Sequence, residues 1–406
     1  MENPSTRFRH PETALGHELI NPADYGGVVN PPVYHASTVT FRDMADMEQR
    51  EAAMLRGDDV LWYGRKGTPT AFALQNAIAA LEGGHRSLVL PSGLAACTSA
   101  ISAFVKADDH ILVSDTVYGP TRHFVKTVLA RYGVAATFYD PLVGAGIKAL
   151  MRPNTRLVVV ESPGSQTFEI QDIPAIADVA HRHGALVVMD NTWATPLYFK
   201  PFEHGVDVSV QAATKYIVGH SDATLGVITA NREHWPVLRE YVLTIGQTAG
   251  PDDLYLAQRG LRTMALRLER HWKSALEVAS WLAARPEVER VLHPALPGDP
   301  GHALWKRDFR GASGLFSIVL KPCGDTAARA FVDRLELFAL GFSWGGFESL
   351  IMPFDGASGR EASRWQYTGP AFRLHIGLEA PADLMADLAQ GFVALKKAAH
   401  ADAVSA

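Results

Sequence analysis

The chain has 406 residues, 47% hydrophobic and 20% charged, which is long enough for two domains with separate cores. Its 38 Lys and Arg against 43 Asp and Glu give a net charge of −5 with no basic run, so we expect no nucleic acid partner. No apolar stretch approaches the length of a membrane span and the first residues lack the apolar core of a signal peptide, so we expect a cytoplasmic protein with no membrane partner.

The first 66 residues are the least regular part of the sequence. They contain Pro4, Pro11, Pro22, Pro31 and Pro32 and little sustained periodicity, apart from a short helix predicted near residues 43–56. We predict an extended N-terminal arm over residues 1–66. Such an arm usually packs on another surface, often that of a neighbouring subunit.

Residues 67–255 alternate short apolar runs with helix-length segments. The runs are nearly continuous in Val, Leu and Ile, as expected for parallel strands that helices cover on both faces. We therefore predict an α/β domain with a mostly parallel sheet of seven strands, near residues 87–90, 110–115, 136–140, 156–161, 186–191, 208–213 and 225–230. Ligands of such sheets bind at the carboxyl ends of the strands.

Residues 256–406 predict a smaller C-terminal α+β domain. One long helix is expected to run from Leu261 to Leu282, because apolar residues recur three, four or seven apart, and to end before Pro286. Strands are predicted at 314–320, 338–342 and 372–378, helices near 324–336 and 381–398, and a frayed end after Lys397.

Two ionisable residues in the larger domain suggest a cofactor. Asp190 ends an apolar strand, and Lys215 lies 25 positions further on, past the next strand. A carboxylate at a strand end can keep the ring nitrogen of pyridoxal phosphate protonated, while a lysine from the next crossover forms a Schiff base with its aldehyde. Each residue alone is more often a helix cap or a surface charge, so the interpretation depends on their neighbours.

The segment from Ser92 to Leu94 follows a strand and begins a helix, so the backbone amides of Gly93 and Leu94 are predicted to form an anion-binding site. An ordinary serine cap is the alternative reading. Thr214 offers a hydroxyl to the same phosphate. Tyr118, in a strand-to-helix loop, is predicted to stack on a flat ring.

Two arginines lie in contexts that suggest anion binding. In the arm, Arg65 is predicted to clamp a phosphate, and Tyr63 to bond that phosphate or meet the substrate. Arg373 lies on an otherwise apolar strand. A buried arginine needs an anion, and the α-carboxylate of an amino acid would serve.

Other chemistries have weaker support. Cys97 and Cys323 are far apart, so we predict neither a disulfide framework nor a thiolate zinc site. His181 and His183 are two apart on a helix and face different ways, so no metal site is predicted. Residues 143–146 lack the third glycine of a dinucleotide fingerprint.

Taken together, these motifs resemble the Cys/Met-metabolism pyridoxal phosphate enzymes, and among them the bacterial cystathionine β-lyases, over nearly the whole chain. Six ordered segments carry the resemblance: 63–70 (YGRKGTPT), 92–93 (SG), 190–194 (DNTWA), 211–222 (QAATKYIVGHSD), 343–349 (SWGGFES) and 373–379 (RLHIGLE). The resemblance implies a pyridoxal phosphate-dependent transferase of fold type I, like aspartate aminotransferase. It also implies a homotetramer of two dimers whose active sites are completed across the dimer interface.

Site roles follow from the resemblance by position. Lys215 is expected to be the Schiff-base lysine, Asp190 the partner of the ring nitrogen, and Tyr118 the stacking ring. The phosphate is expected to contact Ser92, Gly93, Leu94 and Thr214. The neighbouring subunit's site is expected to receive Tyr63 and Arg65. The substrate is expected to contact Arg373, Ser343 and Trp344. Lys215, Tyr118 and Tyr63 are the expected catalytic groups.

The implied reaction is β-elimination of L-cystathionine to homocysteine, pyruvate and ammonia, a transsulfuration step of methionine biosynthesis. Trp344 stands where γ-lyases and γ-synthases of the family typically carry leucine, a pattern associated with bacterial β-lyases. Residues 161–166 lack the Ser-Asn-Pro turn of many relatives, which puts one contact to the cofactor ring in doubt. A cysteine or S-conjugate β-lyase, a γ-lyase and an amino acid sensor without turnover are the alternatives.

Overall fold

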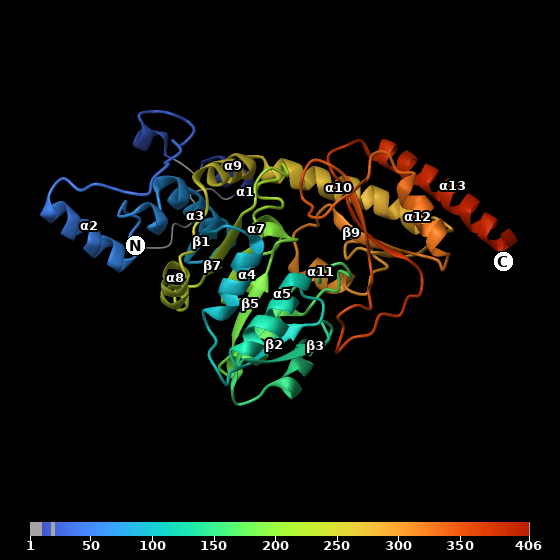
Figure 1. The fold of residues 1–406 in the computed structure, drawn as a ribbon, viewed down its shortest axis with the longest axis horizontal. Helices are drawn as coiled ribbons and strands as arrows, with labels where there is room; N and C mark the ends of the chain where they lie inside the picture. The colour runs from blue at the N-terminus through green and yellow to red at the C-terminus, as the bar shows by residue number, and fades with distance from the viewer. Residues whose placement is uncertain (1–9, 18–20, 406) are drawn as a thin grey trace.

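The computed structural model describes residues 10–17 and 21–405, whose strands form two separate β-sheets (Figure 1). The larger sheet has the order β1-β7-β6-β5-β4-β2-β3. Only β7 runs against its neighbours, β1 and β6, and the other four pairs are parallel. The strands are β1 Arg86–Leu90, β2 His110–Ser114, β3 Ala135–Tyr139, β4 Thr155–Glu161, β5 Leu186–Asp190, β6 Val208–Gln211 and β7 Gly226–Ala230. The prediction of a mostly parallel seven-stranded sheet is confirmed.

Both faces of the larger sheet are buried, which explains the continuous apolar runs of its strands. On β4, Val158 and Val160 pack on one face and Leu157 and Val159 on the other, each in a different core cluster. In Figure 1, α4 and α5 lie across the face turned to the viewer. The helices of this part are α3 Pro69–Glu82, α4 Gly93–Ser102, α5 Gly119–Phe124, α6 Ile173–Arg182, α7 Thr195–Tyr198 and α8 Trp235–Thr244.

The smaller sheet has the order β10-β11-β12-β9-β8 and packs against α10, α12 and α13. Its strands are β8 Val288–Leu292, β9 Leu315–Leu320, β10 Ala339–Leu340, β11 Leu350–Phe354 and β12 Ala371–His375; α11 His302–Asp308, α12 Asp325–Asp333 and α13 Pro381–Ser405 are its helices. The prediction missed β8, which carries two charged residues, and β11, which contains Pro353. It also made β10 too long.

The helix predicted between Leu261 and Leu282 is wrong in one respect, because two helices, α9 Pro251–Arg262 and α10 Met264–Ala283, meet at Thr263. Arg267 explains how the break is tolerated: its Nη2 donates to the carbonyl of Gly260 and its Nε to Thr263 Oγ1. A buried side chain thus provides a donor for the Gly260 carbonyl at the break and ties the break to Thr263. The expected fraying after Lys397 is also wrong, since α13 continues to Ser405.

The arm contains α1 Pro11–His17 and the predicted helix, α2 Met44–Arg56, with 3-10 turns at Pro22–Tyr25 and Gly64–Lys66. Figure 1 shows α2 at one end of the molecule and α12 and α13 at the other. Among the described residues, no helix combines the length and apolar character needed to span a bilayer. The three-part division at residues 66 and 255 stays a prediction.

Candidate active site

A cavity of about 530 Å³ lies where the carboxyl ends of the parallel strands face the smaller sheet. Ten of the twelve residues predicted to form the site line it: Ser92, Gly93, Leu94, Tyr118, Asp190, Thr214, Lys215, Ser343, Trp344 and Arg373. They come from positions up to 281 residues apart, Ser92 to Arg373, so the fold brings together motifs that the sequence shows only one by one.

Lys215 follows β6 and points its amine at the smaller domain. The Nζ donates a hydrogen bond to Ser343 Oγ and lies 5.2 Å from the centre of the Trp344 ring. Burial lowers the pKa of the Lys215 amine to about 8, the Arg373 charge adds to that shift, and the Asp190 charge opposes it. An amine that loses its proton near neutral pH is the kind of group that nucleophilic and base catalysis require.

The chain packs closely behind this lysine. Gly345 has a φ of +90°, and a Cβ there would lie 2.9 Å from the Lys215 Cα. Only glycine fits both the left-handed conformation and the space. The glycine therefore lets the segment with Ser343 and Trp344 approach the lysine directly.

Asp190 is the last residue of β5, and its carboxylate accepts hydrogen bonds from three donors. The backbone N–H and Oγ1 of Thr192 donate to its Oδ1, and the Cys97 thiol lies 3.6 Å from its Oδ2. Thr192 Oγ1 also accepts from the N–H of Ala212, which ties the ends of β5 and β6 together. Burial raises the pKa of the Asp190 carboxyl. A positively charged ring nitrogen beside it would favour the carboxylate again.

The first turn of α4 faces the cavity. Ser92 is its N-cap and accepts from the N–H of Ala95 at 3.0 Å, and the first amides of a helix have no partner within it. A Cβ at Gly93 would lie 2.5 Å from the Ala212 Cβ, so glycine allows the helix to start this close to β6. Thr214 Oγ1 bonds both the N–H and the carbonyl of Leu225.

Tyr118 precedes α5, and the residue is 40% exposed. Its backbone N–H donates to Glu161 Oε2 at 2.6 Å. Glu161 ends β4 and lines the cavity, and burial, with Asp190 nearby, raises the pKa of its carboxyl well above the usual range. Sequence reasoning gave Glu161 no role. The available signal was an acidic residue at a strand end, the same signal that identified Asp190.

Arg373 lies on β12, paired with Met352 of β11. Its Nη2 donates to the carbonyl of Ser343 at 3.0 Å, whereas its buried Nε has no hydrogen-bond partner among the described residues. Burial lowers the pKa of this guanidinium to about 10. An unpaired buried N–H beside a cavity fits an anionic ligand.

The other two predicted residues, Tyr63 and Arg65, are described by the structure but lie outside the cavity lining of their own chain. Tyr63 is 41% exposed, and Arg65 Nη1 donates to the carbonyl of Leu243 at 2.8 Å. Their expected contact with a neighbouring subunit's site stays a prediction.

The lining fits pyridoxal phosphate group by group. Lys215 offers an amine of lowered pKa for the aldehyde, Asp190 a buried carboxylate for the ring nitrogen, and α4 an N-terminus for the phosphate. The Arg373 Nε, which bonds to none of the described residues, can donate a hydrogen bond to an anionic group of a second ligand.

Comparison with known proteins supports this assignment. Residues 12–393 match the model of the family described as Cys/Met metabolism PLP-dependent enzyme. A putative cystathionine beta-lyase of Rhizobium johnstonii is 54% identical over 386 residues, covering 94% of this chain and 96% of that protein. Cystathionine beta-lyase MetC of Escherichia coli is 45% identical over 372 residues, covering 90% and 94%. The crystal structure of metB from Corynebacterium glutamicum superposes with a TM-score of 0.86 at 32% identity, covering 95% of this chain and 98% of that one. The chain belongs to the Cys/Met metabolism PLP-dependent enzyme family.

Proposed function

We propose that the protein is a carbon–sulfur β-lyase that cleaves L-cystathionine to homocysteine, pyruvate and ammonia, a step of methionine biosynthesis. The observation that carries the proposal is that Lys215, Asp190 and Arg373, from three separate segments, line one cavity. The relatives named cystathionine beta-lyase, similar over nine-tenths of the chain, supply the substrate and the reaction.

The proton transfers fall to Lys215. Pyridoxal phosphate bound here would supply an electron sink for the pair left by the broken Cα–H bond, and Asp190 would keep its ring nitrogen protonated. The neutral Lys215 amine removes the α-proton, and the resulting ammonium returns a proton as the homocysteine thiolate leaves from Cβ. The enamine that remains is hydrolysed to pyruvate and ammonia.

Ser343 serves this cycle as the hydrogen-bond acceptor for the Lys215 amine. The Trp344 ring, 5.2 Å from the same nitrogen, adds a cation–π contact that favours the ammonium form after proton abstraction. These contacts restrict where the amine can lie, so they direct the proton transfer to one side of the substrate. Tyr118, which lines the cavity, would stack on the cofactor ring and help to move amine protons.

Arg373 binds the substrate's α-carboxylate. Its buried Nε, which has no hydrogen-bond partner among the described residues, is one donor for the incoming anion, and the bond from its Nη2 to the Ser343 carbonyl fixes the plane of the guanidinium. The bulky Trp344 ring lines the cavity. It limits the size of the substrate group that can be attached to the sulfur.

Assembly is part of the proposal. Tyr63 and Arg65, which lie outside the cavity of their own chain, complete the site of a neighbouring subunit, in a cytoplasmic homotetramer built from two dimers. Val28, Val29 and Met44 in the arm expose 54%, 72% and 65% of their surface, which suits a segment that packs on another chain.

The test is to incubate the cofactor-loaded protein with L-cystathionine and identify the keto acid and the thiol released. Pyruvate with homocysteine supports the proposal. The pair 2-oxobutyrate and cysteine would instead mean γ-elimination. If neither pair forms, cysteine and its S-conjugates are the next substrates to test. Release of pyruvate from one of them would make that compound the substrate in place of cystathionine.

A further inference from the structure

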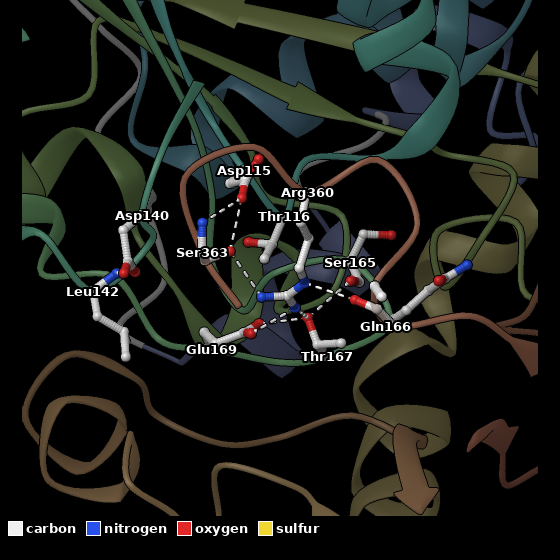
Figure 2. Close-up of polar contacts among 12 residues, drawn as sticks. Asp115, Thr116, Asp140, Leu142, Ser165, Gln166, Thr167, Glu169, Arg360 and Ser363 are labelled. Atoms are coloured by element: carbon white, nitrogen blue, oxygen red, sulfur yellow. Dashed lines mark hydrogen bonds and ion pairs between the residues drawn. The ribbon is translucent and has the colours of Figure 1, made fainter. Parts of the chain in front are cut away.

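Residues 355–363 form the first part of the loop between β11 and β12. This segment crosses from the smaller domain to the larger one (Figure 2). Asp355, Gly356, Ser358 and Arg360 of this loop line the active-site cavity. Its sequence, DGASGREAS, has no apolar side chain larger than alanine. Apolar packing therefore contributes little to its position, and polar contacts must hold it.

Asp115 provides one set of these contacts. Its carboxylate accepts from the backbone N–H groups of Glu361, Ala362 and Ser363 at 2.8 to 3.1 Å and from Ser363 Oγ at 2.7 Å. Arg122 Nη2 adds a fifth donor at 2.6 Å. Although burial opposes it, these bonds hold the pKa of Asp115 below its usual range.

Arg360 provides the second set, shown at the centre of Figure 2. Its Nη2 donates to Thr167 Oγ1 at 2.8 Å and Glu169 Oε1 at 2.9 Å, both after β4 in the larger domain. Its Nε and Nη1 donate to Gly356 O and Ser363 Oγ within the loop. The guanidinium therefore holds the loop in shape and fastens it to the larger domain at the same time.

The same loop is the tip of the hairpin that carries Arg373. On β11 and β12, Met352 pairs with Arg373 and Phe354 with Ala371, and the loop begins at the next residue, Asp355. Asp115 itself precedes Tyr118 by three residues, in the segment after β2. One carboxylate thus joins the hairpin of Arg373 to the segment of Tyr118.

We propose that Asp115 is a positioning residue that holds the tip of the β11–β12 hairpin on the larger domain and so sets the place of Arg373 relative to Lys215. This inference depends on the role proposed above for Arg373, binding of the substrate's α-carboxylate. Asp115 lines the cavity, but its carboxylate is occupied by the loop amides, Ser363 and Arg122, so we expect it to act through Arg373 and not by contacting the substrate. Its effect should therefore appear in the binding of every amino acid, whatever its side chain.

The test compares the Asp115→Asn holoenzyme with the wild type. L-alanine has an α-carboxylate and no leaving group on Cβ, so it cannot undergo β-elimination, and its dissociation constant, read from the cofactor absorbance, reports carboxylate binding. We expect a roughly tenfold rise in that constant and in the KM for L-cystathionine, with kcat within about twofold of the wild type. Hydrogen exchange at the amides of 361–363 should become faster, because they lose their charged acceptor.

Asp140→Asn is the matched control. Asp140 follows β3 as Asp115 follows β2, but within the described part of the chain its side chain accepts only from the N–H of Leu142, and it lies apart from the 355–363 loop in Figure 2. It should behave as the wild type. Arg360→Gln and Ser363→Ala weaken the same attachment, so they should raise the dissociation constant of L-alanine and the KM for L-cystathionine less than Asp115→Asn does. If Asp115→Asn does not fold, these two variants carry the test.

Three results would overturn the inference: unchanged binding of L-alanine despite faster exchange, a rise in KM confined to L-cystathionine, or an equal effect of Asp140→Asn. Failure of the proposed function looks different. In that case the wild type releases no pyruvate and homocysteine from L-cystathionine, while the L-alanine measurement still reports whether Asp115 positions the carboxylate site.

Discussion

Glu161 and Asp190 are register partners at the carboxyl ends of the adjacent parallel strands β4 and β5, and both are cavity residues. Two partly buried carboxyl groups this close do not both ionise readily, and desolvation raises the pKa of each. Because Thr192 donates twice to Asp190, Asp190 is the better placed of the two to carry the charge. We therefore expect the proton that the pair retains to lie on Glu161, which accepts from the N–H of Tyr118.

Glu161→Gln should therefore be almost silent, with kcat/KM for L-cystathionine within about threefold of the wild type, because glutamine is also neutral and keeps an acceptor oxygen. Glu161→Ala should lower kcat/KM by roughly tenfold or more, because it removes the acceptor that supports Tyr118. Steady-state kinetics of the two variants decide the question. If glutamine were as harmful as alanine, the carboxylate charge of Glu161 would be required.

Lys215→Ala should abolish turnover, with a loss of about four orders of magnitude or more in kcat, because no other amine of the described residues lies in the cavity lining. Pyruvate release from L-cystathionine measures it. Lys306→Ala, which removes an exposed lysine on α11, is the control and should leave kcat unchanged. Near-normal turnover without Lys215 would refute its assignment as the proton-transfer group.

The lowered pKa of Lys215 predicts a pH dependence of stability in the cofactor-free protein. Between about pH 8 and the usual lysine value of 10.5, the unfolded chain carries a proton at this position that the folded chain has lost. Stability contributed at this site therefore rises with pH in that window and is flat below it. Relative to Lys215→Met, the wild type should gain stability from pH 8 to 10 in urea unfolding. A constant difference would mean that the amine titrates normally in the folded protein.

Much of this arrangement could be predicted from the sequence, and what could not has a common cause. The seven strands were readable because burial on both faces makes their apolar runs continuous. Lys215, Asp190 and Arg373 stood out because ionisable residues rarely end or interrupt such runs. The roles of Glu161, Asp115 and Arg360 depend on partners in loops, and loop sequences carry no periodicity that places them in space.

Arg373→Ala should act mainly on substrate binding. Removing the guanidinium leaves the α-carboxylate without its charged partner in a buried site, a loss of about 2–4 kcal/mol, which raises KM for L-cystathionine by roughly 30- to 1000-fold. The effect on kcat should be smaller, since Lys215 and Asp190 stay in place. Arg373→Lys keeps the charge but loses the planar donor pair, so its KM should lie between the two. An unchanged KM in Arg373→Ala would show that the carboxylate binds elsewhere.

The proposal that subunits share active sites predicts recovery of activity in hybrids. A hybrid dimer of one Lys215→Ala chain and one Arg65→Ala chain contains one site with both defects and one intact site, if Arg65 acts across the interface. Co-expression with two affinity tags isolates tetramers that contain both chains, and each hybrid dimer within them keeps one intact site, so pyruvate release should recover to at most half that of the wild type, while both parent variants are nearly inactive. The control pairs Lys215→Ala with Arg373→Ala, two residues that line the same chain's cavity, and leaves no intact site in the hybrid. Recovery in the first hybrid and not in the second places Arg65 in the neighbour's site; no recovery in either means that each chain completes its own site.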